Sequence, residues 1–169
     1  MLKRITLSEG ATDTIINAAV RGYEARYKEE RLGILLGRVY QGIVLVKRAV
    51  VYRGGKRTRT SASVDPYQFE RRVYALQAES GLDFLGSFHT HNEVSGSISS
   101  ALSQADKTPI CDDPPSLVEI IAAIWASNGS VRPSRYYFQG GSDEYRYRLS
   151  GYDYQQGFRI LPVYSKIST

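Results

Sequence analysis

Cysteine is almost absent from this sequence. The one cysteine, Cys111, has no partner with which to form a disulfide within the chain. Without a second cysteine, the chain also lacks the paired thiols of a zinc ribbon or a thiol-redox motif. We therefore interpret Cys111 as structural or incidental.

Long apolar runs are also missing, so no segment has the roughly 20 apolar residues of a membrane-spanning helix. The first ten residues, MLKRITLSEG, lack the apolar core and the small-residue cleavage site of a signal peptide. Together with the scarcity of cysteine, these absences favour a cytoplasmic protein that does not bind a membrane.

The rest of the composition is typical of a globular protein, with 42% hydrophobic and 23% charged residues in a chain of 169. This length suits a single domain over residues 1–169. Much of the net charge of +5 comes from residues 52–61, where two adjacent glycines and the lack of helical periodicity favour a surface loop. Its basic residues would also suit a nucleic-acid-binding module, a function that we do not expect here. They are Arg53, Lys56, Arg57 and Arg59.

Hydrophobic periodicity predicts a mixed α/β fold of the α+β type. Residues 2–7 favour a strand, and Ser8 is a candidate N-cap for a helix whose apolar stripe extends to Tyr27. Residues 32–52 are β-branched and aliphatic except at Gln41-Gly42, which predicts an antiparallel hairpin.

The second half of the chain is predicted to be mostly strands. Asp65 followed by Pro66 is typical of a helix start, and this second helix should end at Gly81. Periodicity alone leaves residues 117–127 open to a strand or a buried helix, and we favour the strand. Further strands are expected over residues 82–91, 135–140, 145–149 and 158–165.

Histidine is nearly as scarce as cysteine, and its placement is informative. The two histidines, His89 and His91, lie one residue apart at the end of the predicted strand 82–91. Side chains two residues apart on a strand share a face, so both imidazoles should project together while Phe88 and Thr90 point the other way. Two imidazoles can converge there on a metal ion.

A catalytic zinc ion usually has three protein ligands. With no histidine left, the third must be an aspartate, a glutamate or the lone cysteine, and Asp106 on an expected short helix is the best-placed candidate. Ser103 would share its helical face, with its hydroxyl near the metal. A general base is also needed, and local chemistry does not select it among 17 acidic residues.

The pattern His89-x-His91, a spacer, then Ser103-x-x-Asp106 resembles the motif of the JAMM (MPN-plus, Mov34/PAD-type) metalloproteases. Upstream, the segment EERLGILLG resembles the Glu-x-x-Gly-x-Leu-x-Gly segment of the same family. The order of predicted elements is similar to that of an MPN domain over roughly residues 1–140. The resemblance implies an MPN/JAMM domain, which is a cytidine-deaminase-like mixed curved β-sheet flanked by helices.

The resemblance also implies a role for each matched residue. His89, His91 and Asp106 would bind Zn²⁺, Glu30 would act as the catalytic acid/base, and Ser103 would stabilise the oxyanion. The implied activity is that of a deubiquitinase-like zinc metallopeptidase. It would hydrolyse a peptide or isopeptide bond at the C-terminus of a ubiquitin-like or sulfur-carrier-like protein.

Two features depart from the family pattern. Asn92 stands where the family usually has proline, and the spacer of residues 92–102 has eleven residues in place of seven. A longer loop rich in glycine and serine adds little entropic cost, so the four extra residues can loop out without separating the ligands. We expect this protein to differ from its relatives here.

Other functions also fit parts of the pattern. A non-catalytic MPN-type scaffold is the main alternative, although such scaffolds usually lack metal ligands that are present here. Two histidines and a carboxylate also suit ferrous iron, but such sites usually recruit a histidine from a distant strand, and this chain has none. Ser103 and Asp106 also fit a helix N-cap followed by an acidic first turn, and this role is compatible with metal binding.

Overall fold

The computed structural model describes residues 1–58, 60–93, 98–126 and 134–166. Two α-helices lie in this part of the chain, α1 (Glu9–Glu24) and α2 (Pro66–Ser80), together with two short 3₁₀ helices, Ala105–Lys107 and Tyr154–Gln156. The strands are β1 (Arg4–Leu7), β2 (Leu32–Tyr40), β3 (Ile43–Tyr52), β4 (Lys56–Arg57), β5 (Ala62–Ser63), β6 (Asp83–Asn92), β7 (Val118–Ala126), β8 (Phe138–Gly141), β9 (Tyr145–Asp153), β10 (Arg159–Leu161) and β11 (Val163–Ser165).

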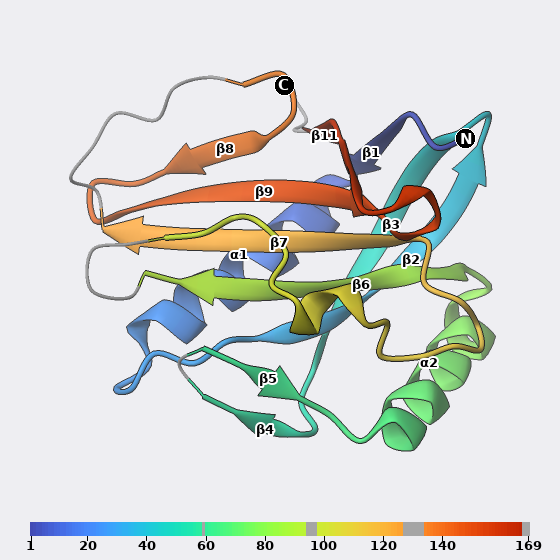
Figure 1. The fold of residues 1–169 in the computed structure, drawn as a ribbon, viewed down its shortest axis with the longest axis horizontal. Helices are drawn as coiled ribbons and strands as arrows, with labels where there is room; N and C mark the ends of the chain where they lie inside the picture. Colours follow the sequence, from blue (N-terminus) through green and yellow to red (C-terminus); the bar gives the residue numbers. More distant parts are fainter. Residues whose placement is uncertain (59, 94–97, 127–133, 167–169) are drawn as a thin grey trace.

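Nine of these strands form one mixed sheet in the order β10-β9-β7-β6-β2-β3-β1-β11, with β8 also paired to β9 (Figure 1). β4 and β5 form a separate antiparallel pair. The expected α+β class is therefore confirmed for the described residues. None of the helices described is long and apolar enough to span a membrane.

The large sheet curls until its two ends nearly meet. β10 pairs with β9 at one end of the strand order, and β11 pairs with β1 at the other. Only Pro162 separates β10 from β11, and its carbonyl accepts a hydrogen bond of 2.9 Å from the Ile5 N–H. Proline has no N–H to donate to a sheet, so it suits this step between strands. The curvature encloses one face of the sheet.

The helix ends are set by local capping. The Ser8 side chain accepts from the Ala11 N–H at the start of α1, and Asp65 accepts from the Gln68 N–H at the start of α2. Both N-caps were predicted, as was the end of α2 at Gly81, which adopts a left-handed conformation with φ 64°. α1 ends at Glu24, so the prediction that it reaches Tyr27 was too long.

Three sequence predictions about strands can be compared with the structure. Residues 32–52 form the predicted antiparallel hairpin of β2 and β3. Residues 117–127, which were open to a helix, contain β7, which pairs with both β6 and β9. The basic segment 52–61 was expected to be a surface loop, but it contains β4, paired with β5.

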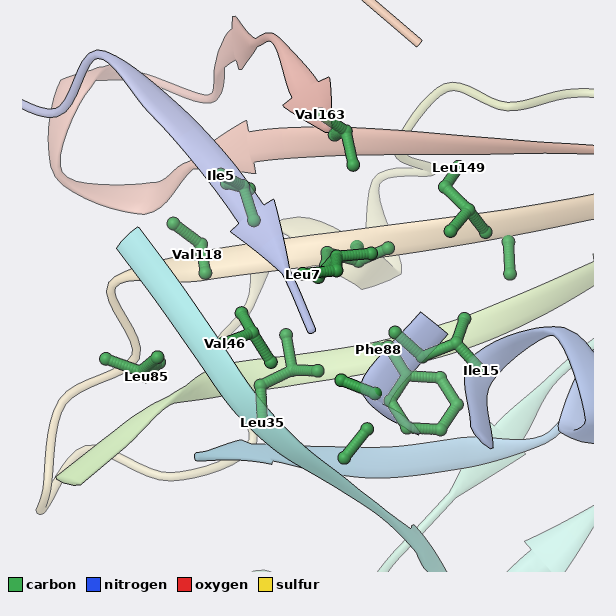
Figure 2. Close-up of a cluster of buried hydrophobic side chains, with 14 of the residues drawn as sticks. Ile5, Leu7, Ile15, Leu35, Val46, Leu85, Phe88, Val118, Leu149 and Val163 are labelled. Atoms are coloured by element: carbon green, nitrogen blue, oxygen red, sulfur yellow. The ribbon is translucent and has the colours of Figure 1, made fainter. Parts of the chain in front are cut away.

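The two helices cover opposite faces of the sheet, and each covers its own hydrophobic core. On β2, Leu35 packs in the core that α1 covers, whereas Ile34 and Leu36 pack in the core under α2. Figure 2 shows the first core, in which Ile15 of α1 lies near Phe88 of β6. The alternation of side chains along a strand thus assigns neighbouring residues to different faces.

A glycine on β6 sets the face on which the histidines lie. The register of β2 and β6 shifts between Leu35 and Leu36, next to Gly86, which has φ 141°. A Cβ atom on Gly86 would lie 1.8 Å from the Val118 carbonyl oxygen, so no other residue fits without backbone movement. After this irregularity Phe88 points into the α1 core, which places His89 on the opposite face.

Candidate metal centre

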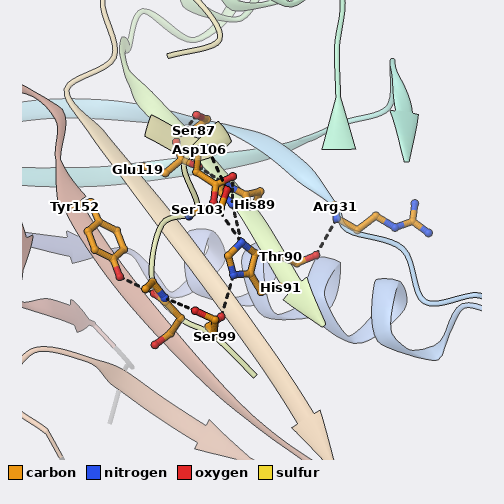
Figure 3. Close-up of polar contacts among 12 residues, drawn as sticks. Arg31, Ser87, His89, Thr90, His91, Ser99, Ser103, Asp106, Glu119 and Tyr152 are labelled. Atoms are coloured by element: carbon orange, nitrogen blue, oxygen red, sulfur yellow. Dashed lines mark hydrogen bonds and ion pairs between the residues drawn. The ribbon is translucent and has the colours of Figure 1, made fainter. Parts of the chain in front are cut away.

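Three side chains converge above the end of β6. His89 and His91 come from β6, and Asp106 comes from the 3₁₀ helix that follows the spacer (Figure 3). The Nε2 atoms of the two histidines are 3.0 Å apart. The Asp106 carboxylate lies 3.2 Å from Nε2 of His89 and 3.6 Å from Nε2 of His91. The structure therefore brings together the three ligands predicted from the sequence, as a group that could bind a metal ion.

The spacing of these donor atoms suits a small divalent cation. In tetrahedral zinc sites, bonds to nitrogen and oxygen of about 2.0–2.1 Å place two ligand atoms about 3.3 Å apart. The two Nε2 atoms are 3.0 Å apart, Oδ1 of Asp106 is 3.2 Å from Nε2 of His89, and Oδ2 of Asp106 is 3.6 Å from Nε2 of His91, all close to that value. The two imidazoles and the Asp106 carboxylate are therefore close enough together to bind one ion.

Each histidine is oriented through its other ring nitrogen. Nδ1 of His89 lies 2.7 Å from the Glu119 carboxylate on β7, and Nδ1 of His91 lies 2.9 Å from the Ser99 carbonyl oxygen. Both partners accept hydrogen bonds, so each Nδ1 carries the hydrogen and donates it. Glu119 is 2% exposed and also accepts from the Ser87 hydroxyl at 2.5 Å. Such outer partners hold metal-binding histidines in place.

The protonation of the two Nδ1 atoms determines what the Nε2 atoms can do. In neutral imidazoles with hydrogen on Nδ1, each Nε2 offers a lone pair. Two lone pairs and a carboxylate then face one another across about 3 Å. Such a group of acceptors needs a positive charge between its members, which a proton or a metal ion can carry.

The pKa shifts at the site reflect the same demand for positive charge. Burial works to lower the pKa of His89, but hydrogen bonds with Asp106 and Glu119 outweigh it and raise the pKa to about 10. Burial works to raise the pKa of Asp106, but hydrogen bonds with His89 and His91 hold it well below its usual range. Without a metal ion, His89 thus holds a proton that a cation would displace.

Glu30 lies beside this group, as the resemblance implied. It lines the same cavity of about 380 Å³ as His89, His91 and Asp106. Its backbone N–H donates to the Thr58 carbonyl at 2.9 Å, which anchors this end of β2 to the basic segment 52–61. Burial raises the pKa of Glu30 to about 7, because the opposing attraction of the two histidines is weaker. Its carboxyl can therefore gain or lose a proton near neutral pH.

Ser103 and Asp106 hold each other in a reciprocal turn. The Ser103 N–H donates to the Asp106 carboxylate at 2.6 Å, and the Asp106 N–H donates to the Ser103 hydroxyl oxygen at 3.3 Å. The capping role and the place beside the metal ligands thus occur together. The expected short helix is only the 3₁₀ turn Ala105–Lys107. Because Ser103 accepts here, its own hydroxyl hydrogen stays free to donate into the cavity that it lines.

The long spacer contributes directly to the site. The Ser99 carbonyl orients His91, and the next carbonyl, that of Ser100, accepts a hydrogen bond of 2.6 Å from the Tyr152 hydroxyl on β9. Residues 94–97 of the spacer lie outside the described part of the chain. Asn92, the residue that replaces the family's proline, lines the cavity, and neither polar atom of its buried amide has a partner among the described residues.

Glu119 was not identified from the sequence. A signal for it was present, because it is the only charged residue in VEIIAAIWA, the otherwise apolar strand β7. A single charge in a buried strand requires a partner. The partner is evident only once β6 and β7 pair in parallel, with Ser87 opposite Glu119 and His89 two residues further along.

Comparison with known proteins supports the class of fold. No protein-family model matches the chain, and no curated protein matches its sequence. The structure is similar to the solution structure of protein DSY2949 from Desulfitobacterium hafniense, with a TM-score of 0.62 and 18% sequence identity, over 96% of this chain and 92% of that chain. At this identity the likeness is one of fold. The chain is thus an α+β protein with a candidate metal centre, and its membership of the JAMM family stays a prediction.

Proposed function

We propose that this protein is a zinc-dependent metallopeptidase of the JAMM type. In this proposal it hydrolyses a peptide or isopeptide bond at the C-terminus of a ubiquitin-like or sulfur-carrier-like protein. The observation that carries the proposal is the convergence of three donor atoms beside a carboxyl group, Glu30, whose pKa is raised to about 7. The substrate class follows from the sequence resemblance.

The residues divide the work of hydrolysis between them. His89, His91 and Asp106 would hold the zinc ion, which when bound would supply Lewis-acid polarisation of the scissile carbonyl. Glu30 takes a proton from the attacking water and returns it to the leaving amine. A pKa near 7 suits both transfers, because each requires the carboxyl to change protonation near the working pH.

Ser103 can stabilise the negative charge that develops on the carbonyl oxygen. Its hydroxyl oxygen accepts from the Asp106 N–H, which leaves the hydroxyl hydrogen available to the substrate. A fixed donor of this kind lowers the barrier because it is already oriented before charge develops. Its position near the ligands is held by the hydrogen bond from its own N–H to Asp106.

An extended substrate tail has a place to dock next to the cavity. Residues 60–62, at the start of β5, line the same cavity as the histidines. β4 and β5 form a two-stranded sheet of their own, so each has an edge unpaired in the described structure. A tail added there as a further strand would lead its terminal residues toward Glu30.

Zinc content and peptidase activity of two matched variants test the proposal. We expect about one equivalent of bound zinc and cleavage of a linear fusion of a ubiquitin-like protein. Glu30→Gln should retain zinc and lose at least about 100-fold in activity, as removal of a general base does. Glu29→Gln, a change of the same charge at the adjacent half-exposed residue, should stay active. Equal activity in Glu30→Gln would contradict the mechanism, and zinc binding with no cleavage would favour a partner-binding scaffold.

A further inference from the structure

A second hollow lies on the other face of the sheet, between α1 and the end of β3. Its volume is about 510 Å³, and four arginines line it together with Thr14 and Asn17. The arginines come from four separate segments of the chain. They are Arg21 on α1, Arg31 before β2, Arg53 after β3 and Arg57 on β4.

The positive charge of this arginine hollow is poorly compensated within the described structure. The described residues that line it include no acidic residue. Among the described residues, the one ion pair that these arginines make joins Arg31 to Glu29 at 3.0 Å, and the buried Nε atom of Arg31 has no partner. Figure 3 shows the Arg31 side chain extending away from the histidines, to the far side of β6. Several guanidinium groups therefore retain hydrogen-bonding capacity toward a ligand.

Mutual repulsion among the arginines also favours the binding of an anion. Burial lowers the pKa of Arg57, and the charges of Arg31 and Arg53 lower it further, against the opposing effect of Glu29. Four like charges around one hollow raise the free energy of the empty site, and a bound anion relieves that cost. Guanidinium groups are the donors best matched to the paired oxygens of phosphate.

The surroundings favour a compact anion over a long polymer. Arg53 also lines a third, larger hollow, which contains Arg48, Arg71 and Arg72. A nucleic-acid strand bound to this surface would cover both the arginine hollow and this larger hollow. In that larger hollow, however, Arg48 is paired with Glu79 at 3.0 Å, and Arg71 lies over the Tyr67 ring. Both contacts occupy arginines of the larger hollow, and the smaller hollow, with a volume of about 510 Å³, suits a small molecule.

We propose that the arginine hollow binds a small molecule carrying two or more linked phosphates, such as a nucleoside di- or triphosphate or an inorganic polyphosphate. Binding uses Arg21, Arg53 and Arg57, with Arg31 exchanging its contact with Glu29 for the ligand. This site is separate from the metal centre and does not depend on the peptidase proposal. It assigns a role to Arg53 and Arg57, two basic side chains of segment 52–61 that do not line the metal-centre cavity.

Calorimetric titration of the full chain with tripolyphosphate, ATP and orthophosphate tests this proposal. EDTA is present throughout, because polyphosphates also chelate divalent ions. We expect saturable binding of tripolyphosphate and ATP, and weaker binding of orthophosphate. The double variant Arg21→Gln/Arg53→Gln should bind tripolyphosphate at least about ten-fold more weakly, because it loses two charge-assisted contacts. Both arginines are exposed and make no ion pair with described residues, so the variant should fold.

Two further variants make the test specific. Arg71→Gln/Arg72→Gln has the same change in net charge and should bind tripolyphosphate like the wild type. Glu29→Gln should bind it more tightly, because Arg31 is released from its carboxylate. No saturable binding, or equal affinity in Arg21→Gln/Arg53→Gln, would overturn the proposal. A single-stranded oligonucleotide gives a further test. The proposal is also overturned if the oligonucleotide binds more tightly than tripolyphosphate, is not displaced by it, and binds more weakly to Arg71→Gln/Arg72→Gln. Such a result would identify a nucleic-acid surface.

Discussion

The metal centre and the arginine hollow lie on opposite faces of the sheet, and they carry opposite charge. Glu30 lines the metal-centre cavity, while the next residue, Arg31, lines the hollow on the other face. Likewise His89 and His91 face the metal centre, while Thr90 between them points the other way (Figure 3). Glu30 and Arg31, two successive residues just before β2, therefore serve two sites that have opposite electrostatic requirements.

The two regions are joined by hydrogen bonds as well as by sequence. The Arg31 N–H donates to the Thr90 hydroxyl oxygen at 2.8 Å, and the Thr90 N–H donates to the Arg31 carbonyl at 2.8 Å. Thr90 is fully buried, so these contacts are screened from water. The comparison shows that a thin sheet can separate an anionic site from a cationic one while it holds both in register.

The face of the sheet on which His89 and His91 lie depends on Gly86, and replacement of this glycine should have the largest effect. In Gly86→Ala the new Cβ meets the Val118 carbonyl at 1.8 Å, so the free energy of unfolding should fall by more than about 3 kcal/mol. Denaturant unfolding measures this. Gly10→Ala is the control, because no atom lies within 4 Å of its added Cβ, and stability should be unchanged or slightly higher. Equal stabilities would contradict the tight contact at Gly86.

Removing a ligand should abolish the metal centre and leave the arginine hollow intact. Asp106→Asn loses the only carboxylate ligand, so zinc affinity should fall by more than about 100-fold, beyond the loss typical of an outer partner. Competition with a chromophoric chelator measures the affinity, and tripolyphosphate binding should not change. Asp83→Asn, at the exposed start of β6, is the control. Unchanged zinc affinity in Asp106→Asn would show that the three donors do not form the site.

The partner of His89 should matter less than a ligand but clearly more than a surface charge. Glu119→Gln weakens the hydrogen bond that orients Nδ1 of His89, so zinc affinity should fall about 10–100-fold. The same chelator competition applies. Glu93→Gln removes a carboxylate that accepts from the Ala126 N–H and lies outside the ligand group, and it should leave affinity unchanged. If both variants bind zinc like the wild type, Glu119 does not support the ligand.

The smallest expected effect is a pH-dependent change in stability from Glu30 in zinc-free protein. Its pKa is about 7 in the folded state against an ordinary 4.5, so the folded state holds more protons between these pH values. The free energy of unfolding therefore falls as pH rises through this range. Glu30→Gln should not show this fall. As the pH rises from 4.5 to 8, its free energy of unfolding should therefore increase by about 1–2 kcal/mol relative to that of the wild type. Glu29→Gln should show no such gain, and parallel pH profiles for all three proteins would contradict the raised pKa.

Much of the fold was predictable because its signals are local. Ser8 and Asp65 cap the two helices as predicted, since a capping side chain bonds to backbone only three residues away. The hairpin of β2 and β3 was also predictable from its composition. The near closure of the sheet was not, because it depends on β11 pairing with β1, more than 150 residues apart in the sequence.

The candidate site was likewise predictable only in part. The sequence by itself determined that His89 and His91 share a face, because side-chain alternation along a strand is a property of the backbone. It also provided Asp106 and Glu30, through spacing and resemblance. Only the tertiary structure decided that Glu119 orients His89 and that Arg21 and Arg31 join the basic segment 52–61 in one hollow. Those contacts join residues from distant segments, and only the pairing of strands and the packing of α1 bring them together.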